Sequence, residues 1–127
     1  MTWLRAVAIA IAGLLGVWLT FDGTKAFATG DYVTPRSGAY AGQLGPWSKV
    51  VAALGLEPRG AFVKSLHVAL GLCWLASAAA FFGQPSMGWW LLLVCSVASL
   101  WYAPLGTALA IANLALLCMP SLRAFAS

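Results

Sequence analysis

The sequence predicts an all-α, multi-pass membrane protein: a bundle of four transmembrane helices with a short amphipathic helix in its long first connection. Of its 127 residues, 62% are hydrophobic and 8% are charged, and the mean hydropathy is +0.90. A soluble domain has about 45–50% apolar and about 25% charged residues, so this chain lacks the polar groups to cover its own surface. We therefore expect residues 1–127 to form a single integral membrane domain.

The first expected span covers residues 4–21. Its stretch 6–21 carries no charge and, at about 1.5 Å per residue, is just long enough to cross most of a hydrocarbon core of about 30 Å. Trp3 and Trp18 flank this stretch as interfacial tryptophans do. The alternative is a signal peptide cleaved near residues 26–28, but Asp22 and Lys25 separate that site from the apolar run. This separation favours a retained helix.

Residues 22–60 form the expected hydrophilic connection, which carries all three acidic residues of the chain. Turn-forming residues fill its first part. Residues 46–55 then predict a short amphipathic helix, because apolar residues recur at helical spacing from Trp47 while Lys49 lies on the opposite face. Two positions for this helix remain open: in the membrane interface, where Trp47 and Lys49 suit the headgroups, or packed over the end of the bundle.

The remaining expected spans cover residues 61–82, 87–102 and 105–119. The apolar run over 87–119 would make a helix of about 50 Å, which is too long for one span, and Pro104 is the natural place to divide it. Trp89 at one end of the third span and Trp101 and Tyr102 at the other fit two interfacial belts. A single kinked helix with a tail in the interface is the alternative.

Four spans place both termini on one side of the membrane. The long connection holds most of the basic residues, so the positive-inside rule favours a cytoplasmic connection and external termini, although Arg5 opposes this orientation. We expect a multi-pass protein of the bacterial inner (plasma) membrane, with the lipid bilayer as its first partner. The basic residues in or beside the connection are Lys25, Arg36, Lys49, Arg59 and Lys64.

Small residues recur four apart on three of the expected helices. Such stripes let helix backbones approach closely in lipid. They predict either packing inside the bundle or a face for transmembrane helices of another subunit or a second copy. The candidate packing residues are Ala12 and Gly16, then Ala69, Cys73 and Ser77, and finally Gly106 and Ala110.

Three polar residues within the expected spans are candidates for a functional role. Lys64 lies near a helix start, from which its long side chain can reach the headgroups. His67, one turn further along, is a candidate proton relay or haem ligand, although a neutral histidine bonded to a neighbouring group is the more ordinary interpretation. A haem held by two histidines would need a second one, which this chain lacks. Asn113 is expected to hydrogen-bond across helices.

Several classes of function are disfavoured. The basic residues are scattered, so nucleic acid is not an expected partner. Three cysteines without a CxxC pair predict buried free thiols and no metal centre. We expect no cofactor and no catalytic residues, because no nucleophile–base pair or phosphate-binding motif is present. With all acidic residues expected outside the spans, a proton-coupled exchanger is also disfavoured.

The sequence thus predicts no specific activity. We expect a small non-catalytic integral membrane protein that serves as a helix-packing subunit or scaffold of a larger membrane complex. The alternative is a small oligomeric transporter or channel that uses His67, Lys64 and Asn113.

Overall fold

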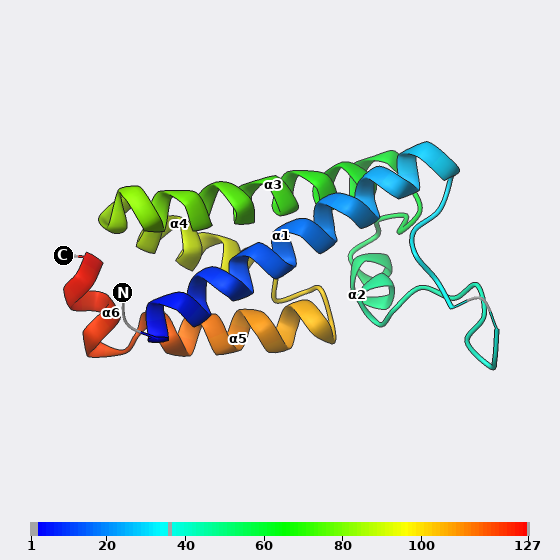
Figure 1. Ribbon diagram of the computed structural model, residues 1–127. Coiled ribbons are helices and arrows are strands. Elements are labelled where there is room, and N and C mark those ends of the chain that lie inside the picture. Colours follow the sequence, from blue (N-terminus) through cyan, green and yellow to red (C-terminus); the bar gives the residue numbers. More distant parts are fainter. Residues whose placement is uncertain (1–2, 36, 127) are drawn as a thin grey trace.

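The predicted all-α fold is confirmed. The computed structural model describes residues 3–35 and 37–126, which contain helices and no strand. Arg36, one of the basic residues used to predict orientation, lies outside the described residues. Helices α1, α3 and α5 run along the long dimension of the molecule, whereas α2 lies across it, and α6 lies beside the start of α1 (Figure 1). They are α1 (Trp3–Thr29), α2 (Trp47–Ala53), α3 (Ala61–Gly83), α4 (Pro85–Ala98), α5 (Leu105–Leu117) and α6 (Pro120–Ala126).

Helices α1 and α3 are the longest and pack against each other toward the connection, whereas the start of α1 lies nearer to α5 (Figure 1). With 27 and 23 residues they extend about 40 and 35 Å, so each exceeds a hydrocarbon core of about 30 Å. They are the two helices in the described chain that are long and apolar enough to cross a membrane. Gly30, at φ +91°, ends α1 in the left-handed conformation that glycine adopts readily.

Helices α4 and α5 form a shorter hairpin beside this pair. They have 14 and 13 residues, or about 20 Å each, and therefore cover one half of α1 and α3 (Figure 1). Pro85 begins α4 at a position where a missing backbone N–H is tolerated. The indole N–H of Trp89 donates to the carbonyl of Leu117 at 2.9 Å and joins the open end of the hairpin.

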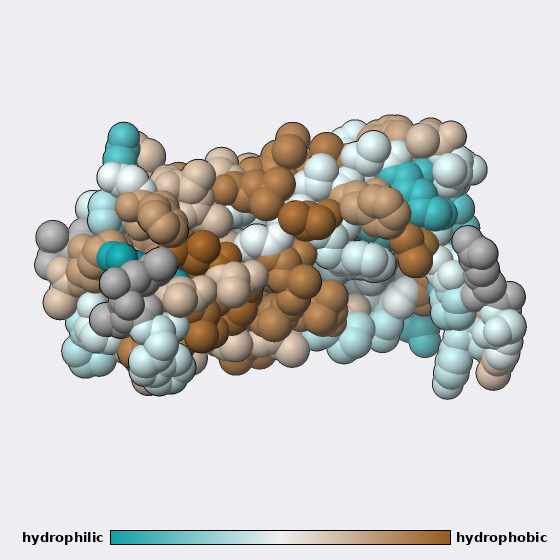
Figure 2. All heavy atoms as spheres, viewed as in Figure 1, coloured by the Kyte–Doolittle hydropathy of each residue, from teal (hydrophilic) through white to brown (hydrophobic). Residues whose placement is uncertain are grey.

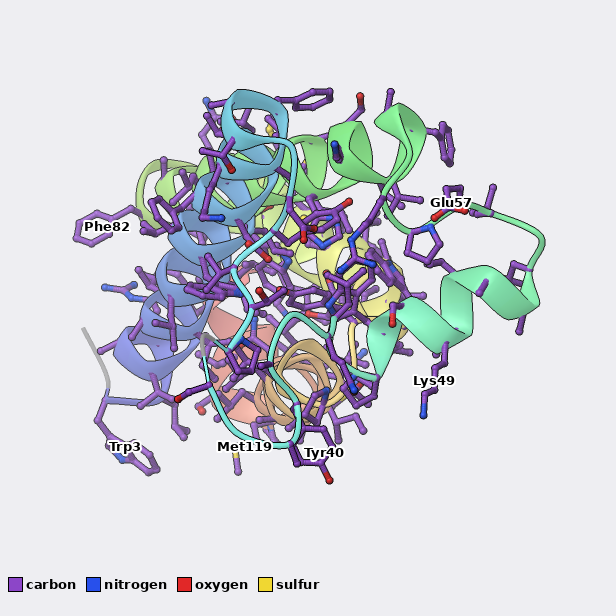
Figure 3. All side chains as sticks on the ribbon, turned by 90° about the vertical axis from the view of Figure 1, so that its right-hand side faces the viewer. Trp3, Tyr40, Lys49, Glu57, Phe82 and Met119 are labelled. Carbon is purple, nitrogen blue, oxygen red and sulfur yellow. The ribbon has the colours of Figure 1, made fainter. Side chains whose placement is uncertain are left out.

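The connection fills the other half of the molecule. Helix α2 lies beyond the α4–α5 turn (Figure 1), and the backbone N–H of Trp47 donates to the carbonyl of Ala103 in that turn at 3.1 Å. Trp47 and Val51 point inward and are buried. Lys49 and Tyr40 project outward at this end of the molecule (Figure 3). The connection therefore packs against the bundle as part of its core.

Several helix boundaries differ from the sequence prediction. Helix α1 continues past residue 21 to Thr29, because the loop folds back and bonds its polar side chains. Helix α4 ends at Ala98, since the segment 99–104 turns toward α2. Helix α5 ends at Leu117, and an additional helix, α6, begins at Pro120. The amphipathic segment is helical over 47–53 within the predicted 46–55. The α4 and α5 segments are separate helices, so the single kinked helix is wrong.

Glycines permit the close approach of α1 and α3. A Cβ atom added to Gly71 would lie 2.5 Å from the backbone nitrogen of Thr20 and 2.9 Å from the carbonyl oxygen of Gly16. A Cβ on Gly23 would meet Val68 at 2.7 Å. Backbone atoms cannot move aside as a side-chain tip can, so Gly71 is the position where contact between the two helices demands glycine.

Charge is concentrated at the two ends of the molecule. Between Lys64 and Arg123 the sequence contains no Lys, Arg, Asp or Glu. On the face shown in Figure 2, apolar side chains cover the middle and hydrophilic ones gather toward the ends. Trp3 and Phe82 project away from the bundle into the surroundings (Figure 3).

We predict that Gly71→Ala lowers the free energy of unfolding by about 1–3 kcal/mol, because the added methyl group forces the backbones of α1 and α3 apart. Gly13 is a matched control, since a Cβ there meets nothing within 4 Å. Gly13→Ala should be neutral or stabilising by up to about 1 kcal/mol through helix propensity. Unfolding in detergent, followed by circular dichroism, measures both. Equal effects of the two substitutions would contradict the proposed contact.

Candidate functional site

The most distinctive cluster is a group of rings around His67, which we call the aromatic layer: Tyr32, Trp47, His67, Trp101 and Tyr102. The imidazole centroid lies 4.6 Å from that of Trp47, 4.7 Å from Tyr32, 5.3 Å from Tyr102 and 5.6 Å from Trp101. The rings come from the loop after α1, from α2, from α3 and from the α4–α5 turn. The aromatic layer therefore joins every segment at this end of the bundle.

The tautomer of His67 follows from its one hydrogen bond. Nδ1 lies 2.9 Å from the carbonyl oxygen of Val63, which can only accept, so Nδ1 carries the proton and donates. Nε2 is then an acceptor, and it has no hydrogen-bond partner among the described residues. The side chain is fully buried. In this arrangement His67 is a neutral core residue enclosed by aromatic rings.

Two charged side chains of α1 hold the start of the connection. Asp22 Oδ1 accepts a hydrogen bond from the backbone N–H of Val33 at 2.7 Å. Lys25 Nζ donates to the carbonyl oxygens of Asp31 at 3.1 Å and Tyr32 at 3.2 Å. The Asp22 carboxylate is 3% exposed, so the expectation that every acidic residue lies in a hydrophilic connection is wrong for Asp22.

The outer part of the connection is held by Arg59. Its Nε donates to Asp31 Oδ1 at 3.0 Å, and one terminal nitrogen donates to the carbonyl of Gly42 at 3.0 Å. Partial burial opposes ionisation of Asp31, but the hydrogen bond and charge of Arg59 outweigh it and hold the pKa of Asp31 below its usual value. Asp31 therefore stays ionised at neutral pH and keeps this contact.

The buried side chain of Tyr32 joins the beginning of the connection to its end. Burial, and then the nearby carboxylates of Asp22 and Asp31, raise the pKa of Tyr32 above its usual value. The hydroxyl thus retains its proton and donates it to the carbonyl of Pro58 at 2.8 Å. This bond links the two ends of the connection.

A pocket of about 210 Å³ lies beside the aromatic layer. Trp18, Asp22, Trp47 and Tyr102 line it. The indole N–H of Trp18 donates to the Tyr102 hydroxyl at 2.8 Å, which orients both rings and ties α1 to the α4–α5 turn. The pocket brings a carboxylate and three aromatic side chains together.

The three polar residues expected within the spans do not form one site. Lys64 is half-buried, and its Nζ donates to the carbonyl of Gly30 at 3.4 Å, which holds the end of α1. His67 belongs to the aromatic layer. Asn113 is fully buried in α5, and neither of its amide atoms has a hydrogen-bond partner among the described residues. The expected hydrogen bond of Asn113 across helices is therefore not formed within the part of the chain that the structure describes.

The candidate packing residues divide into two groups. Ala12, Gly16, Ser77, Gly106 and Ala110 are buried between helices of the same chain. Ser77 Oγ lies 3.3 Å from Cys95 Sγ and so joins α3 to α4. Ala69 and Cys73 face outward from α3 instead.

The structure also places the expected interfacial residues and the cysteines. Trp47 and Tyr102 are buried, and Trp101 is half-buried within the aromatic layer, because the α4–α5 turn lies against α2. Trp89 is half-buried and Lys49 is exposed. All three cysteines are free, and Cys95 is buried, but Cys73 and Cys118 are exposed on this chain. The expectation of buried thiols is therefore wrong for those two.

Sequence reasoning missed the pocket because it ended the first helix too early. Trp18 and Asp22 are four residues apart, so once α1 continues to Thr29 they share one helical face. That spacing was available in the sequence. Tyr32 carried no comparable signal, because its partners lie far away along the chain.

No family model matches the chain, and neither a curated protein nor a solved structure matches it. Within the described residues, no group of three His, Cys, Asp or Glu side chains is placed to hold a metal ion. The site itself contains the carboxylate of Asp22, the imidazole of His67 and the rings around them.

We predict that Tyr102→Phe lowers the free energy of unfolding by about 1–3 kcal/mol, because the indole N–H of Trp18 loses its acceptor in a largely buried place. Tyr40 is 72% exposed, and Tyr40→Phe should change stability by less than about 0.5 kcal/mol. Detergent unfolding curves followed by near-ultraviolet circular dichroism compare the two. A Tyr102→Phe protein as stable as the Tyr40→Phe control would show that the bond contributes nothing.

Proposed function

We propose that this chain is a multi-pass protein of the bacterial inner membrane and a non-catalytic packing subunit or scaffold of a larger membrane complex. The observation that carries the proposal is the uncharged, apolar middle of the molecule. Large apolar side chains there are more than half exposed on several helices. They include Val17, Phe21, Leu72, Val94, Val97 and Ile111.

The distribution of charge supports a transmembrane orientation of the long axis. Arg5 and Arg123 lie near one end, and the charged residues of the connection lie at the other. A bilayer would leave both groups in water and cover the exposed apolar side chains between them. In water the same surface would be an aggregation hazard.

In this orientation α1 and α3 cross the bilayer, and α4 and α5 complete a four-helix bundle as short segments. At about 20 Å each, they do not reach the far side of a core of about 30 Å. The turn between them then lies just below the headgroups on the side of the connection. Irregular backbone is tolerated there where protein covers it, and Trp47 binds the carbonyl of Ala103 in that turn.

The outward face of α3 supports the role as a packing subunit. Ala69 and Cys73 are small, four residues apart and exposed, so another transmembrane helix could approach the α3 backbone closely there. The buried small residues already pack helices of this chain against one another, which leaves the outward face of α3 for another chain.

The alternative transporter or channel built on Lys64, His67 and Asn113 is less well supported. Rings enclose His67, and Asn113 has no hydrogen bond to either of the other two. A path for a proton or ion through these residues would require the aromatic layer to open.

Membrane insertion predicts that Cys73 reacts slowly with a maleimide in intact membranes. Cys73 lies in the middle of α3, where the hydrocarbon would keep a water-soluble maleimide away from the thiol. Cys118, just past the end of α5, is a matched exposed thiol near the surface. In single-cysteine variants, labelling of Cys73 should be at least ~10-fold slower than that of Cys118, and the two should react equally after denaturation. Equal labelling in intact membranes would refute insertion.

The role as a subunit predicts that a bulky residue on the outward face of α3 separates the chain from its partner. After mild detergent extraction the chain should migrate as a complex of defined composition, and Ala69→Leu should reduce co-purification of its partner by at least ~5-fold without loss of helix content. Ala10→Leu, on an exposed position of α1, should leave the complex intact. A wild-type chain that elutes as a monomer would refute this role.

A further inference from the structure

The pocket beside the aromatic layer has a closed interior and an open mouth. Trp47, Tyr102 and Asp22 are each no more than 5% exposed and form its interior. Val33 and Leu105 also line it, and they are 39% and 42% exposed. A small ligand can therefore enter between the connection and the start of α5.

The carboxylate in this pocket lacks a balancing charge in direct contact. The described residues contain one salt bridge, Arg59 with Asp31, and Asp22 takes no part in it. Lys25 lies one turn further along α1, but its ammonium group is bonded to loop carbonyls. A buried carboxylate without a paired cation is costly, and a cation bound in the pocket would remove that cost.

Aromatic rings are the other component that a cation needs. Trp18, Trp47 and Tyr102 line the pocket together with Asp22. The ring faces of tryptophan and tyrosine attract ammonium groups, most strongly where water is excluded, and several such rings around one site recognise quaternary ammonium. The bond from Trp18 to Tyr102 fixes two of these rings before any ligand arrives.

We propose that this pocket binds the ammonium group of a small organic cation, with Asp22 as its counter-charge and Trp18, Trp47 and Tyr102 as its aromatic wall. The pocket volume of about 210 Å³ is below the roughly 300–1,000 Å³ of sites for drug-sized ligands. It suits a headgroup-sized cation such as a trimethylammonium group. This binding site goes beyond the proposed packing role and does not require it.

Two sources could supply such a group. Asp22 lies in the part of α1 that approaches the charged end of the molecule, where a bilayer would place its headgroups. The ammonium could belong to a lipid headgroup, or to a free cation entering from water. Both present the same chemistry to Asp22 and the rings.

The first test compares choline with its neutral carbon isostere, 3,3-dimethyl-1-butanol, by calorimetric titration of the full chain in an uncharged sugar-based detergent. The two probes have nearly the same shape, so the carboxylate and the rings should make choline bind at least ~10-fold more tightly. Equal binding of the two, or no saturable binding of choline, would overturn the proposal.

The second test removes the counter-charge. Asp22→Asn keeps an oxygen acceptor for the Val33 N–H but loses the charge, and it should weaken choline binding at least ~10-fold. Glu57→Gln removes one negative charge from an exposed position outside this pocket and should bind as the wild type does. Equal affinities of Asp22→Asn and Glu57→Gln would refute the assignment of Asp22.

Folding of the variants is checked by circular dichroism. If Asp22→Asn does not fold, Trp18→Phe provides the second variant, because it reduces the aromatic wall and removes the bond to Tyr102 while leaving the carboxylate in place. It should also weaken choline binding, and unchanged binding by a folded Trp18→Phe protein would overturn the proposed aromatic wall.

The third test identifies the source. The chain is placed in nanodiscs of phosphatidylglycerol, with or without phosphatidylcholine. If lipid headgroups occupy the pocket, phosphatidylcholine should lower the apparent affinity for choline in the wild type, and Glu57→Gln should behave in the same way. If the ligand is a free cation, affinity should be the same in both discs. Loss of choline binding in both kinds of disc would count against the pocket itself.

Discussion

The difference in length between the two helix pairs determines most of this structure. α1 and α3 have 27 and 23 residues, whereas α4 and α5 have 14 and 13, so the shorter hairpin leaves half of the longer pair uncovered. The connection covers that half and brings Trp47 and Tyr32 against His67. The aromatic layer, the buried Asp22 and the pocket all lie where the connection meets the α4–α5 turn. Each of them depends on the hairpin ending where it does.

The contact between α1 and α3 is the part of the fold that tolerates added side-chain atoms least. Gly71 faces the backbone of Thr20, and Gly23 faces Val68, so the two helices can approach only where side chains are absent. This approach also fixes the distance between Asp22 on α1 and His67 on α3. The glycines therefore position the polar residues of the site as well as the helices that carry them.

The sequence was sufficient for the all-helical fold, because long apolar runs separated by Pro and Gly leave few other possibilities. The sequence did not predict where α1 ends, because Asp22 and Lys25 resemble loop residues until their hydrogen bonds to the loop are known. It also placed Trp101 and Tyr102 at the membrane interface, since periodicity cannot distinguish a ring buried by a distant segment from one at an interface. The site consists mainly of such long-range contacts, so less of it could be predicted.

The bonds made by the last turns of α1 have a consequence for the order of folding. Asp22 and Lys25 bind loop atoms within eleven residues of themselves, so α1 and the start of the connection can associate as soon as both are synthesised. The hydrogen bond from Trp18 to Tyr102 can form only later, because Tyr102 lies 84 residues further along the chain. The α1 side of the pocket can therefore form early in folding. The side contributed by the α4–α5 turn forms only after that turn has been synthesised and has packed against α1. A chain that stops before this turn retains the carboxylate without the wall that encloses it.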